Sequence, residues 1–163
     1  IVSSQSIRMA GDKMNSDIAS YIKNKHGLVI GEHTAEKIKM ELGTALRVDD
    51  PETMDVRGRD VATGMPKQIT VNENEIEEAL HDTLEQIVSA AVNVLETIPP
   101  ELASDIIDRG IMLTGGTSLL KGVDQLFSAR LKVPVVVSQD PLDNVAKGAG
   151  EMLERMQKTE RKK

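Results

Sequence analysis

The chain has 163 residues, enough for one domain with a buried core, and its formal net charge is −6. The acidic balance argues against a nucleic-acid binder, whose affinity rests on a basic surface, and the scarcity of aromatic side chains argues against recognition by base stacking. The absence of cysteine excludes disulfides and thiolate chemistry, so aliphatic side chains and methionines must fill the core.

The sequence contains no run of the roughly 18 to 20 apolar residues that a membrane span needs, and no charged-then-apolar leader. We therefore expect a cytoplasmic chain, and because it begins at Ile1 rather than Met we expect a fragment of a longer protein. One basic cluster lies at Lys158 and residues 161–163. It is typical of a solvated terminus, and its alternative role is a weak attraction to an anionic membrane surface.

The first part of the chain predicts a strand and two helices. Alternating apolar residues favour a strand from Val2 to Met9, and Gly11 and Asp12 mark the start of a helix that ends in cations and a glycine. Thr34 is in position to cap a short second helix. The predicted apolar faces are Met14, Ile18, Tyr21 and Ile22 in the first helix, and Ile38 and Leu42 in the second.

The texture of the sequence changes between Asp49 and Asn72. Residues 54–59 and 67–71 look like short strands with a turn-rich connection, which predicts a β-hairpin-like insertion and a candidate small lobe. The longest helix follows, from near Asn74 to about residue 98, where two prolines stop it. Its apolar residues recur at spacings of three and four, which predicts a face packed on the core.

The rest of the chain alternates helices and strands. We predict a short helix opened by Pro100, a strand at 111–113, a helix over 119–131, a strand over 133–137 and a last helix over 141–156. This order is mixed α/β and implies a sheet with helices packed on it.

The most informative stretch is the Gly115-Gly116-Thr117-Ser118 turn, which lies between a predicted strand and a predicted helix. Two residues without Cβ let a ligand approach the backbone closely, and Thr117 or Ser118 is in position to cap the helix. Free N–H groups at a helix start favour an anion or a polar ligand edge. An ordinary strand-to-helix turn explains the same residues, and the turn alone does not distinguish the two.

Six segments that follow one another along the chain carry a family resemblance. They are Ser6–Asp12, Ile30–Lys39, Val56–Asp60, Pro99–Ala103, Asp108–Gly116 and Asp140–Leu142. Each is modest alone, but in series and without large gaps they are specific. Together they resemble MreB, the family of bacterial actin homologues, over nearly the whole chain. The part they match is the C-terminal half of that family, its subdomain II.

The resemblance implies an α/β fold, namely an actin-like ATPase lobe with a ribonuclease-H-like sheet, packed helices and a small α/β insertion subdomain. Residues 1–30 and 73–163 correspond to the larger part and residues 31–72 to the insertion, while the N-terminal lobe of the parent protein is absent. Asp140-Pro141-Leu142 resembles a hinge segment of the family. In the Ala10-Gly11-Asp12 turn, the family usually has two glycines before the acid.

The same resemblance implies a protein that binds ATP with Mg²⁺, self-associates into filaments and organises cell shape. It implies a cytoplasmic protein associated with the membrane surface. ATP lies between two lobes in the family, and this half supplies the adenosine side. The matching residues are Gly115, Gly116, Thr117 and Ser118 in the turn, and Glu36, Lys37 and Lys39 in the helix that borders adenine and ribose.

Two details of the sequence bear on that site. Family members often carry a third glycine where Thr117 stands, so this chain places a Cβ next to the expected nucleotide. Glu36 and Lys39 are three residues apart and share a helix face, which allows them to contact a sugar hydroxyl and a base edge together. A solvated surface pair is the alternative that these residues alone leave open.

Both phosphate loops of the family are missing from the sequence. Because phosphoryl transfer depends on positioning and on metal-borne charge stabilisation, we expect the parent to be a slow ATPase and this chain alone to be inactive. We name no catalytic or metal-binding residue, since His26, His33 and His81 are scattered. Two alternatives stay open: a lobe of an actin-fold sugar kinase or chaperone ATPase, and an adaptor that binds no nucleotide.

Overall fold

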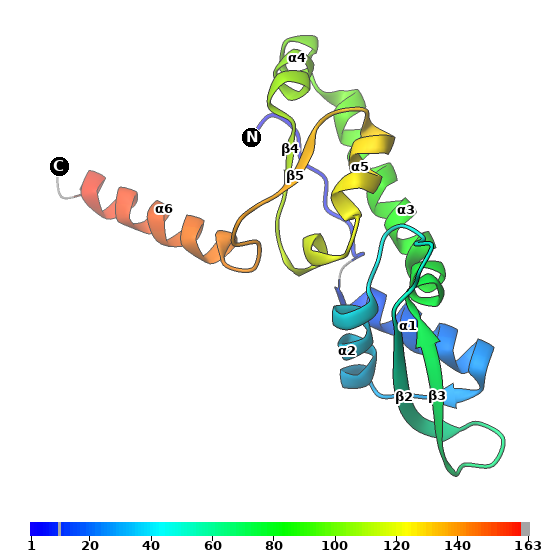
Figure 1. Cartoon of the computed structure of the whole chain (residues 1–163). Coiled ribbons are helices and arrows are strands. Elements are labelled where there is room, and N and C mark those ends of the chain that lie inside the picture. Colours follow the sequence, from blue (N-terminus) through cyan, green and yellow to red (C-terminus); the bar gives the residue numbers. More distant parts are fainter. Residues whose placement is uncertain (10, 161–163) are drawn as a thin grey trace.

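The computed structural model describes residues 1–9 and 11–160, with side chains as far as Met156. Figure 1 shows two parts joined by one long helix, α3 (Glu73–Thr97), which runs from the lower part into the upper part. The lower part holds a three-stranded sheet and the upper part a pair of parallel strands. The last helix, α6 (Asn144–Glu160), projects away from both parts.

The lower part combines two helices with an antiparallel sheet. Its strands are ordered β1-β2-β3, with Leu28 opposite Asp60 and Val56 opposite Ile69. The predicted helix after Gly11 and the predicted hairpin are both confirmed. The elements in chain order are α1 (Gly11–His26), β1 (Leu28–Val29), α2 (Glu32–Leu42), β2 (Thr53–Asp60) and β3 (Pro66–Asn72).

The core of the lower part forms between α1, α2, α3 and the hairpin. Burial of an aliphatic side chain of this size stabilises a fold by about 1.5–3 kcal/mol. The predicted apolar faces point into this core, except that Tyr21 is only partly buried at its edge. The buried side chains are Met14, Ile18 and Ile22 of α1, Ile38 and Leu42 of α2, Val56 and Val71 of the hairpin, and Ile76, Leu80, Leu84 and Val88 of α3.

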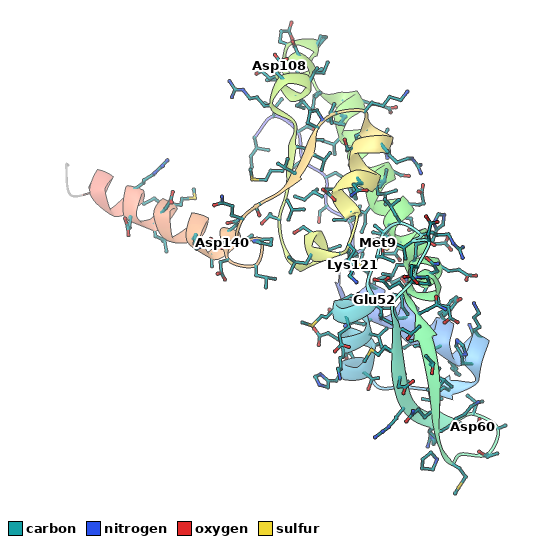
Figure 2. The ribbon with its side chains drawn as sticks, in the orientation of Figure 1. Met9, Glu52, Asp60, Asp108, Lys121 and Asp140 are labelled. Carbon is teal, nitrogen blue, oxygen red and sulfur yellow. The ribbon has the colours of Figure 1, made fainter. Side chains whose placement is uncertain are left out.

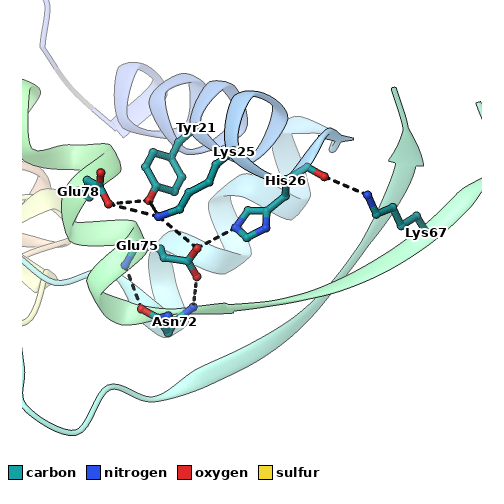
Figure 3. A network of polar contacts seen from close by, with 7 residues as sticks. All are labelled: Tyr21, Lys25, His26, Lys67, Asn72, Glu75 and Glu78. Atoms are coloured by element: carbon teal, nitrogen blue, oxygen red, sulfur yellow. Dashed lines mark hydrogen bonds and ion pairs between the residues drawn. The ribbon is translucent and has the colours of Figure 1, made fainter. Parts of the chain in front are cut away.

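A polar network ties the end of α1 to the start of α3 (Figure 3). The Tyr21 hydroxyl donates to the Glu78 carboxylate (2.7 Å), and the Lys25 ammonium lies over the Tyr21 ring and 3.5 Å from Glu78. The hydrogen bond from Tyr21 and the charge of Lys25 hold the pKa of Glu78 below its usual value. The His26 ring lies 2.8 Å from Glu75, so the last turn of α1 contacts the first turn of α3.

A capping box fixes where α3 begins. The Asn72 side chain accepts a hydrogen bond from the Glu75 N–H (3.1 Å), and the Glu75 carboxylate accepts one from the Asn72 N–H (3.0 Å). The helix therefore starts at Glu73, one residue before the predicted start, and runs to Thr97 as the following prolines predict.

The upper part confirms the predicted alternation of helices and strands. β4 and β5 are parallel, with Met112 opposite Val136. Pro100 takes the first position of α4, where its missing N–H is harmless, and Gly110 ends that helix with φ 76. The elements are α4 (Pro100–Arg109), β4 (Ile111–Leu113), the 3₁₀ helix η1 (Gly116–Leu119), α5 (Val123–Leu131), β5 (Val135–Val137) and then α6.

The prediction of a strand over residues 2–9 is wrong. A strand needs a hydrogen-bonded neighbour, and none of the described strands pairs with this segment. The segment lies along α3 instead, where the Ser3 and Thr97 hydroxyls are 3.3 Å apart and Ile7 and Met9 face Ser89 across a groove.

Three further helix starts differ from the predictions, and one of these is α6, which begins at Asn144 rather than at residue 141. Thr34 does not cap α2, because the helix already begins at Glu32 with Gly31 as its N-cap. The helix predicted over 119–131 begins only at Val123, since the chain passes through the left-handed region at Gly122 (φ 71). The division of the chain into 1–30 with 73–163 and 31–72 stays a prediction, and β1 of the first range pairs with β2 of the second.

Candidate nucleotide-binding site

The candidate site lies at the carboxyl edge of the two parallel strands. β4 ends at Leu113 and leads into the Gly115 turn, while β5 ends at Val137 and leads into Ser138. The Ser138 N–H donates to the Leu113 carbonyl (3.0 Å), so the two exits lie side by side. Ligands of open α/β sheets bind at this edge, so the position of the turn favours a ligand role.

The Gly-Gly turn is open at both glycines. Gly115 has φ 85, a conformation that favours glycine, and a Cβ built there would meet no atom within 4 Å. A Cβ on Gly116 would lie 3.6 Å from Cδ2 of Leu142, which is an ordinary van der Waals contact. Open backbone of this kind is what the close approach of a ligand requires.

The predicted cap at Thr117 or Ser118 is wrong. The Ser118 N–H and hydroxyl both donate to the Gly115 carbonyl (3.1 and 2.7 Å), which closes a 3₁₀ turn instead of satisfying a helix start. Thr117, in the place of the third glycine, lines an apolar hollow of about 150 Å³ beneath the turn together with Leu84 and Phe127. The extra side chain is therefore partly accommodated by the core.

The turn is fastened to the hinge-like segment after β5. The Gly115 N–H and the Thr114 hydroxyl both donate to the Pro141 carbonyl (2.7 and 3.0 Å). The Asn144 amide, at the start of α6, donates to the Thr114 hydroxyl (3.3 Å). The segment that resembles a hinge thus holds the turn directly.

Glu36 and Lys39, the second half of the predicted site, lie on α2. Glu36 is exposed, whereas Lys39 is half-buried and donates from Nζ to the Gly11 carbonyl (3.2 Å). Lys39 therefore faces the start of α1, whose first turn also carries the exposed residue Asp12. The structure brings together α2 and the Gly11 start of α1, which the sequence singled out separately.

Lys37 lies on a different face of α2. Its ammonium is 3.7 Å from the Glu41 carboxylate, and the residue lines a hollow with Asp55 and Arg57 of β2. Of the three predicted α2 residues, Lys37 is thus the one directed toward the hairpin, away from the contact that Lys39 makes with Gly11.

The end of α2 is joined directly to the chain that leaves the turn. The Lys121 N–H donates to the Gly43 carbonyl (3.1 Å) and the Ala45 N–H donates to the Lys121 carbonyl (2.8 Å), which forms a parallel bridge. The packing is close, because a Cβ on Gly43 would lie 2.6 Å from Cδ2 of Leu120. The two groups of predicted residues therefore converge on one junction, although they are far apart in the sequence.

An ion pair reinforces this junction. The Lys121 ammonium lies 2.5 Å from Glu73 and 2.9 Å from Glu52, and the Glu73 side chain is only 4% exposed. Burial pushes the pKa of Glu73 upward, but the hydrogen bonds from Lys121 and from the Glu52 N–H outweigh it and hold the pKa below its usual value. The hydrogen bonds to Glu73 and Glu52 raise the pKa of Lys121, so both partners are charged at neutral pH.

Across the part of the chain that the structure describes, no group of three or more His, Cys, Asp or Glu residues could hold a metal ion. Two of the three histidines instead pair with carboxylates, His26 with Glu75 (2.8 Å) and His81 with Glu77 (3.3 Å). A Mg²⁺ ion that accompanies ATP would therefore need ligands other than a cluster of these side chains.

Sequence comparison identifies the family. The family described as MreB/Mbl protein matches residues 1–161. The chain belongs to the MreB/Mbl family. It is 51% identical over 163 residues to the cell shape-determining protein Mbl of Bacillus subtilis, covering 100% of this chain and 49% of Mbl. It is 48% identical over 154 residues to the cell shape-determining protein MreB of Escherichia coli, covering 94% of this chain and 44% of MreB.

Structural comparison confirms the predicted actin-like α/β fold. MreB5 of Spiroplasma citri bound to AMPPNP superposes with a TM-score of 0.94 at 31% identity, over 99% of this MreB/Mbl chain and 49% of MreB5. A MamK double helical filament shares the fold with a TM-score of 0.77 at 18% identity, over 91% of this chain and 45% of MamK. The chain spans about half the length of the curated relatives it matches.

Three features of the site were not predicted from the sequence. The Gly11 carbonyl is the partner of Lys39, and Lys121 links the turn to α2. The Ser138 hydroxyl is buried at the carboxyl edge of β5 and has no hydrogen-bond partner among the described residues. Ser138 could have been selected from the sequence, because it directly follows a predicted strand. Nothing near Lys121 in the sequence indicated its distant partners.

Proposed function

We propose that this chain is the adenosine-binding half of an ATP-dependent, filament-forming protein that determines cell shape. Its relatives Mbl and MreB are cell shape-determining proteins, the similar MreB5 structures hold AMPPNP and ADP, and MamK forms a double helical filament. Because the chain spans about half of these relatives, the whole activity belongs to a full-length protein, to which this chain contributes one side of the site and part of the polymerisation surface.

The observation that carries the proposal is the junction between α2 and the Gly115 turn. It places an open glycine backbone and a helix with a donor and an acceptor, Lys39 and Glu36, on segments that are joined through Gly43 and Lys121. A flat base edge and a sugar hydroxyl suit such a site, since a few convergent polar groups beside open backbone orient a ligand. The residues that we propose to contact the nucleotide are Glu36, Lys37, Lys39, Gly115, Gly116, Thr117 and Ser118.

The triphosphate requires groups that this set does not supply. The turn and α2 present one ammonium group toward Gly11 and no cluster of acidic side chains for Mg²⁺. Hydrolysis depends on positioned phosphate and metal, so we expect the full-length protein to be a slow ATPase and this chain alone to bind ATP weakly and to be inactive.

Self-association and membrane contact are proposed for the full-length protein in the cytoplasm. Among the helices that the structure describes, none has the length and apolar character of a membrane span. The basic side chains at 158–163 lie outside those that the structure describes. The net charge of −6 argues against a nucleic-acid partner.

Membership of the MreB/Mbl family favours this function over a lobe of an actin-fold sugar kinase or chaperone ATPase. The short hairpin insertion, in which β2 and β3 are joined by residues 61–65, is consistent with that preference. Sedimentation of the full-length protein with ATP separates these functions. A protein that stays in the supernatant and phosphorylates a sugar would overturn the filament proposal.

The adenosine site is tested by Gly116→Val in the full-length protein, with ATP affinity measured by calorimetry. A Cβ at residue 116 would meet only Leu142, at ordinary contact distance, so we expect the fold to persist while the space above the turn is filled. We expect the affinity to fall by about tenfold or more, because close backbone approach is lost. Gly150→Val in α6, where a Cβ meets nothing within 4 Å, is the matched control and should bind ATP normally. Equal affinity of both variants would contradict the assignment.

A further inference from the structure

Lys121 follows the Gly115 turn in the chain and contacts both the end of α2 and the base of the hairpin. Its backbone is bonded to Gly43 and Ala45 at the end of α2, and its side chain reaches Glu52 before β2 and Glu73 at the start of α3. Figure 2 shows Lys121 and Glu52 beside each other where the upper and lower parts meet. A shift of Lys121 would therefore move the turn and α2 relative to each other.

The partner of Lys121 is itself held in place. One oxygen of the Glu73 carboxylate accepts from the ammonium and the other accepts from the Glu52 N–H (3.0 Å), while the Glu73 N–H donates to the Glu52 carbonyl (3.1 Å). Glu73 is 3% exposed, so a rotation of its side chain would break a buried bond. The Lys121 ammonium is thus bound by a Glu73 carboxylate whose own position is fixed by its hydrogen bond to the Glu52 N–H.

Such an arrangement contributes more to geometry than to stability. The cost of burying the Glu73 charge offsets much of its attraction to Lys121, whose side chain is 49% exposed, so an apolar pair of similar volume is often equally stable. What an apolar pair cannot reproduce is the fixed direction of the Lys121 side chain. Lys121 follows Ser118 by only three positions, and Lys39 lies one helical turn before Gly43.

We propose that Lys121, anchored on Glu73 and Glu52, is the positioning residue that sets the gap between α2 and the Gly115 turn, and thereby the affinity of the site for the nucleoside part of ATP. This inference rests on the proposed function of the site. Lys121 touches no ligand in this account and acts through the two segments that it joins.

The test compares ATP affinities, measured by calorimetry, of full-length variants. Lys121→Met should weaken ATP binding by roughly tenfold, and Lys121→Arg, which keeps the charge and both carboxylate contacts, should restore most of it. Because Lys121→Met leaves the buried Glu73 unpaired, the double variant Lys121→Met with Glu73→Gln removes both charges and should fold as well as the parent. The double variant should still bind ATP about tenfold more weakly.

A double-mutant cycle with Lys39→Met separates positioning from a general loss of stability. If Lys121 acts through α2, the effects of Lys121→Met and Lys39→Met on ATP affinity should fall short of additive. Lys25→Met, which removes another lysine with two carboxylate neighbours, is the control and should leave ATP affinity unchanged. If the variant with both Lys121→Met and Glu73→Gln bound ATP as tightly as the parent, the proposed role of Lys121 would be overturned. Failure of the unmutated full-length protein to bind ATP would instead overturn the proposed function itself.

Discussion

The lower and upper parts of the molecule bury their apolar side chains to different degrees. Before residue 89 the helices and the hairpin enclose a core of fully buried aliphatic residues. In the upper part α4 has no buried residue, and the buried apolar side chains are Leu120, Val123, Phe127 and Val135. The large exposed apolar residues concentrate there, among them Ile107, Met112, Val136, Val145, Met152 and Leu153.

This difference shows that the lower part has the better-packed hydrophobic core. The lower part has a capping box, a polar network and a closed core, in which Asn15 Oδ1 is a buried atom without a hydrogen-bond partner among the described residues. The upper part presents a two-stranded sheet and the exposed apolar face of α6. The adenosine site that we propose would lie between them, and it would combine the well-packed helix α2 with a turn that has fewer buried neighbours. We therefore expect stability to be determined mostly by the lower part.

The largest effect should come from the core of the lower part. Leu80 of α3 is fully buried, so Leu80→Ala should lower the free energy of unfolding by about 3 kcal/mol. Leu153→Ala in α6, where the side chain is 60% exposed, should change it by less than about 0.5 kcal/mol. Urea denaturation of the chain followed by circular dichroism gives both values. Similar losses for the two variants would mean that the two parts do not differ as described.

A second pair contrasts glycines. A Cβ on Gly58 of β2 would lie 2.4 Å from the Val29 carbonyl oxygen, so Gly58→Ala must push β1 away and should cost about 1–3 kcal/mol. Gly150→Ala in α6 meets no atom within 4 Å and should gain a few tenths to about 1 kcal/mol from helix propensity. Thermal denaturation scans compare the two, and an unchanged midpoint for Gly58→Ala would contradict the close strand packing.

A third, smaller effect concerns the cap of α3. Asn72→Ala removes the side-chain acceptor for the Glu75 N–H and should destabilise the chain by about 1 kcal/mol. Asn24→Ala, at an exposed position inside α1, is the matched control and should be neutral or slightly stabilising. Urea midpoints measure the difference. If the two variants were equally stable, the capping box would not anchor the helix that joins the two parts.

The smallest effect lies at the hairpin tip. The pKa of Asp60 is held at about 2, below the ordinary 3.8, because its carboxylate accepts hydrogen bonds. The strongest effect comes from the Thr63 N–H, followed by the Lys67 ammonium and, more weakly, the Ala62 N–H. Because the folded pKa is lowered, the stabilisation is fully present above the ordinary value and is lost as pH falls from about 3.8 toward about 2. Titration of the Asp60 carboxyl carbon by NMR checks this. A midpoint near 4 would show that the turn does not hold the charge.

Local patterns in the sequence were sufficient to predict the helices and strands that have one buried face. The stripes of α1 and α3, the hairpin and the prolines around α4 all follow from periodicity and from residues with restricted backbones. The strand predicted at 2–9 was wrong because pairing depends on a neighbour that alternation cannot reveal. For α2, the glycine at position 31 took the N-cap that Thr34 was expected to fill.

The site divides in the same way. The glycines of the turn were selected from their residue type, because glycine lets a ligand approach the backbone, whereas the helix of Lys39 was selected from the family resemblance. The junction could not, because Gly43, Lys121 and Glu73 are brought together by the packing of distant segments. The use of the Ser118 hydroxyl within its own turn also escaped prediction, since the 3₁₀ geometry competes with capping at the same residue.

Hydrogen–deuterium exchange of the full-length protein with and without saturating ATP tests the central claim most directly. Peptides that cover 32–43 and 114–121 should exchange more slowly when ATP is bound, because both sides of the adenosine site become ordered together. The hairpin tip at 60–67 should exchange at the same rate in both states. Measurable ATP binding without protection of 32–43 and 114–121 would contradict the assignment of this site.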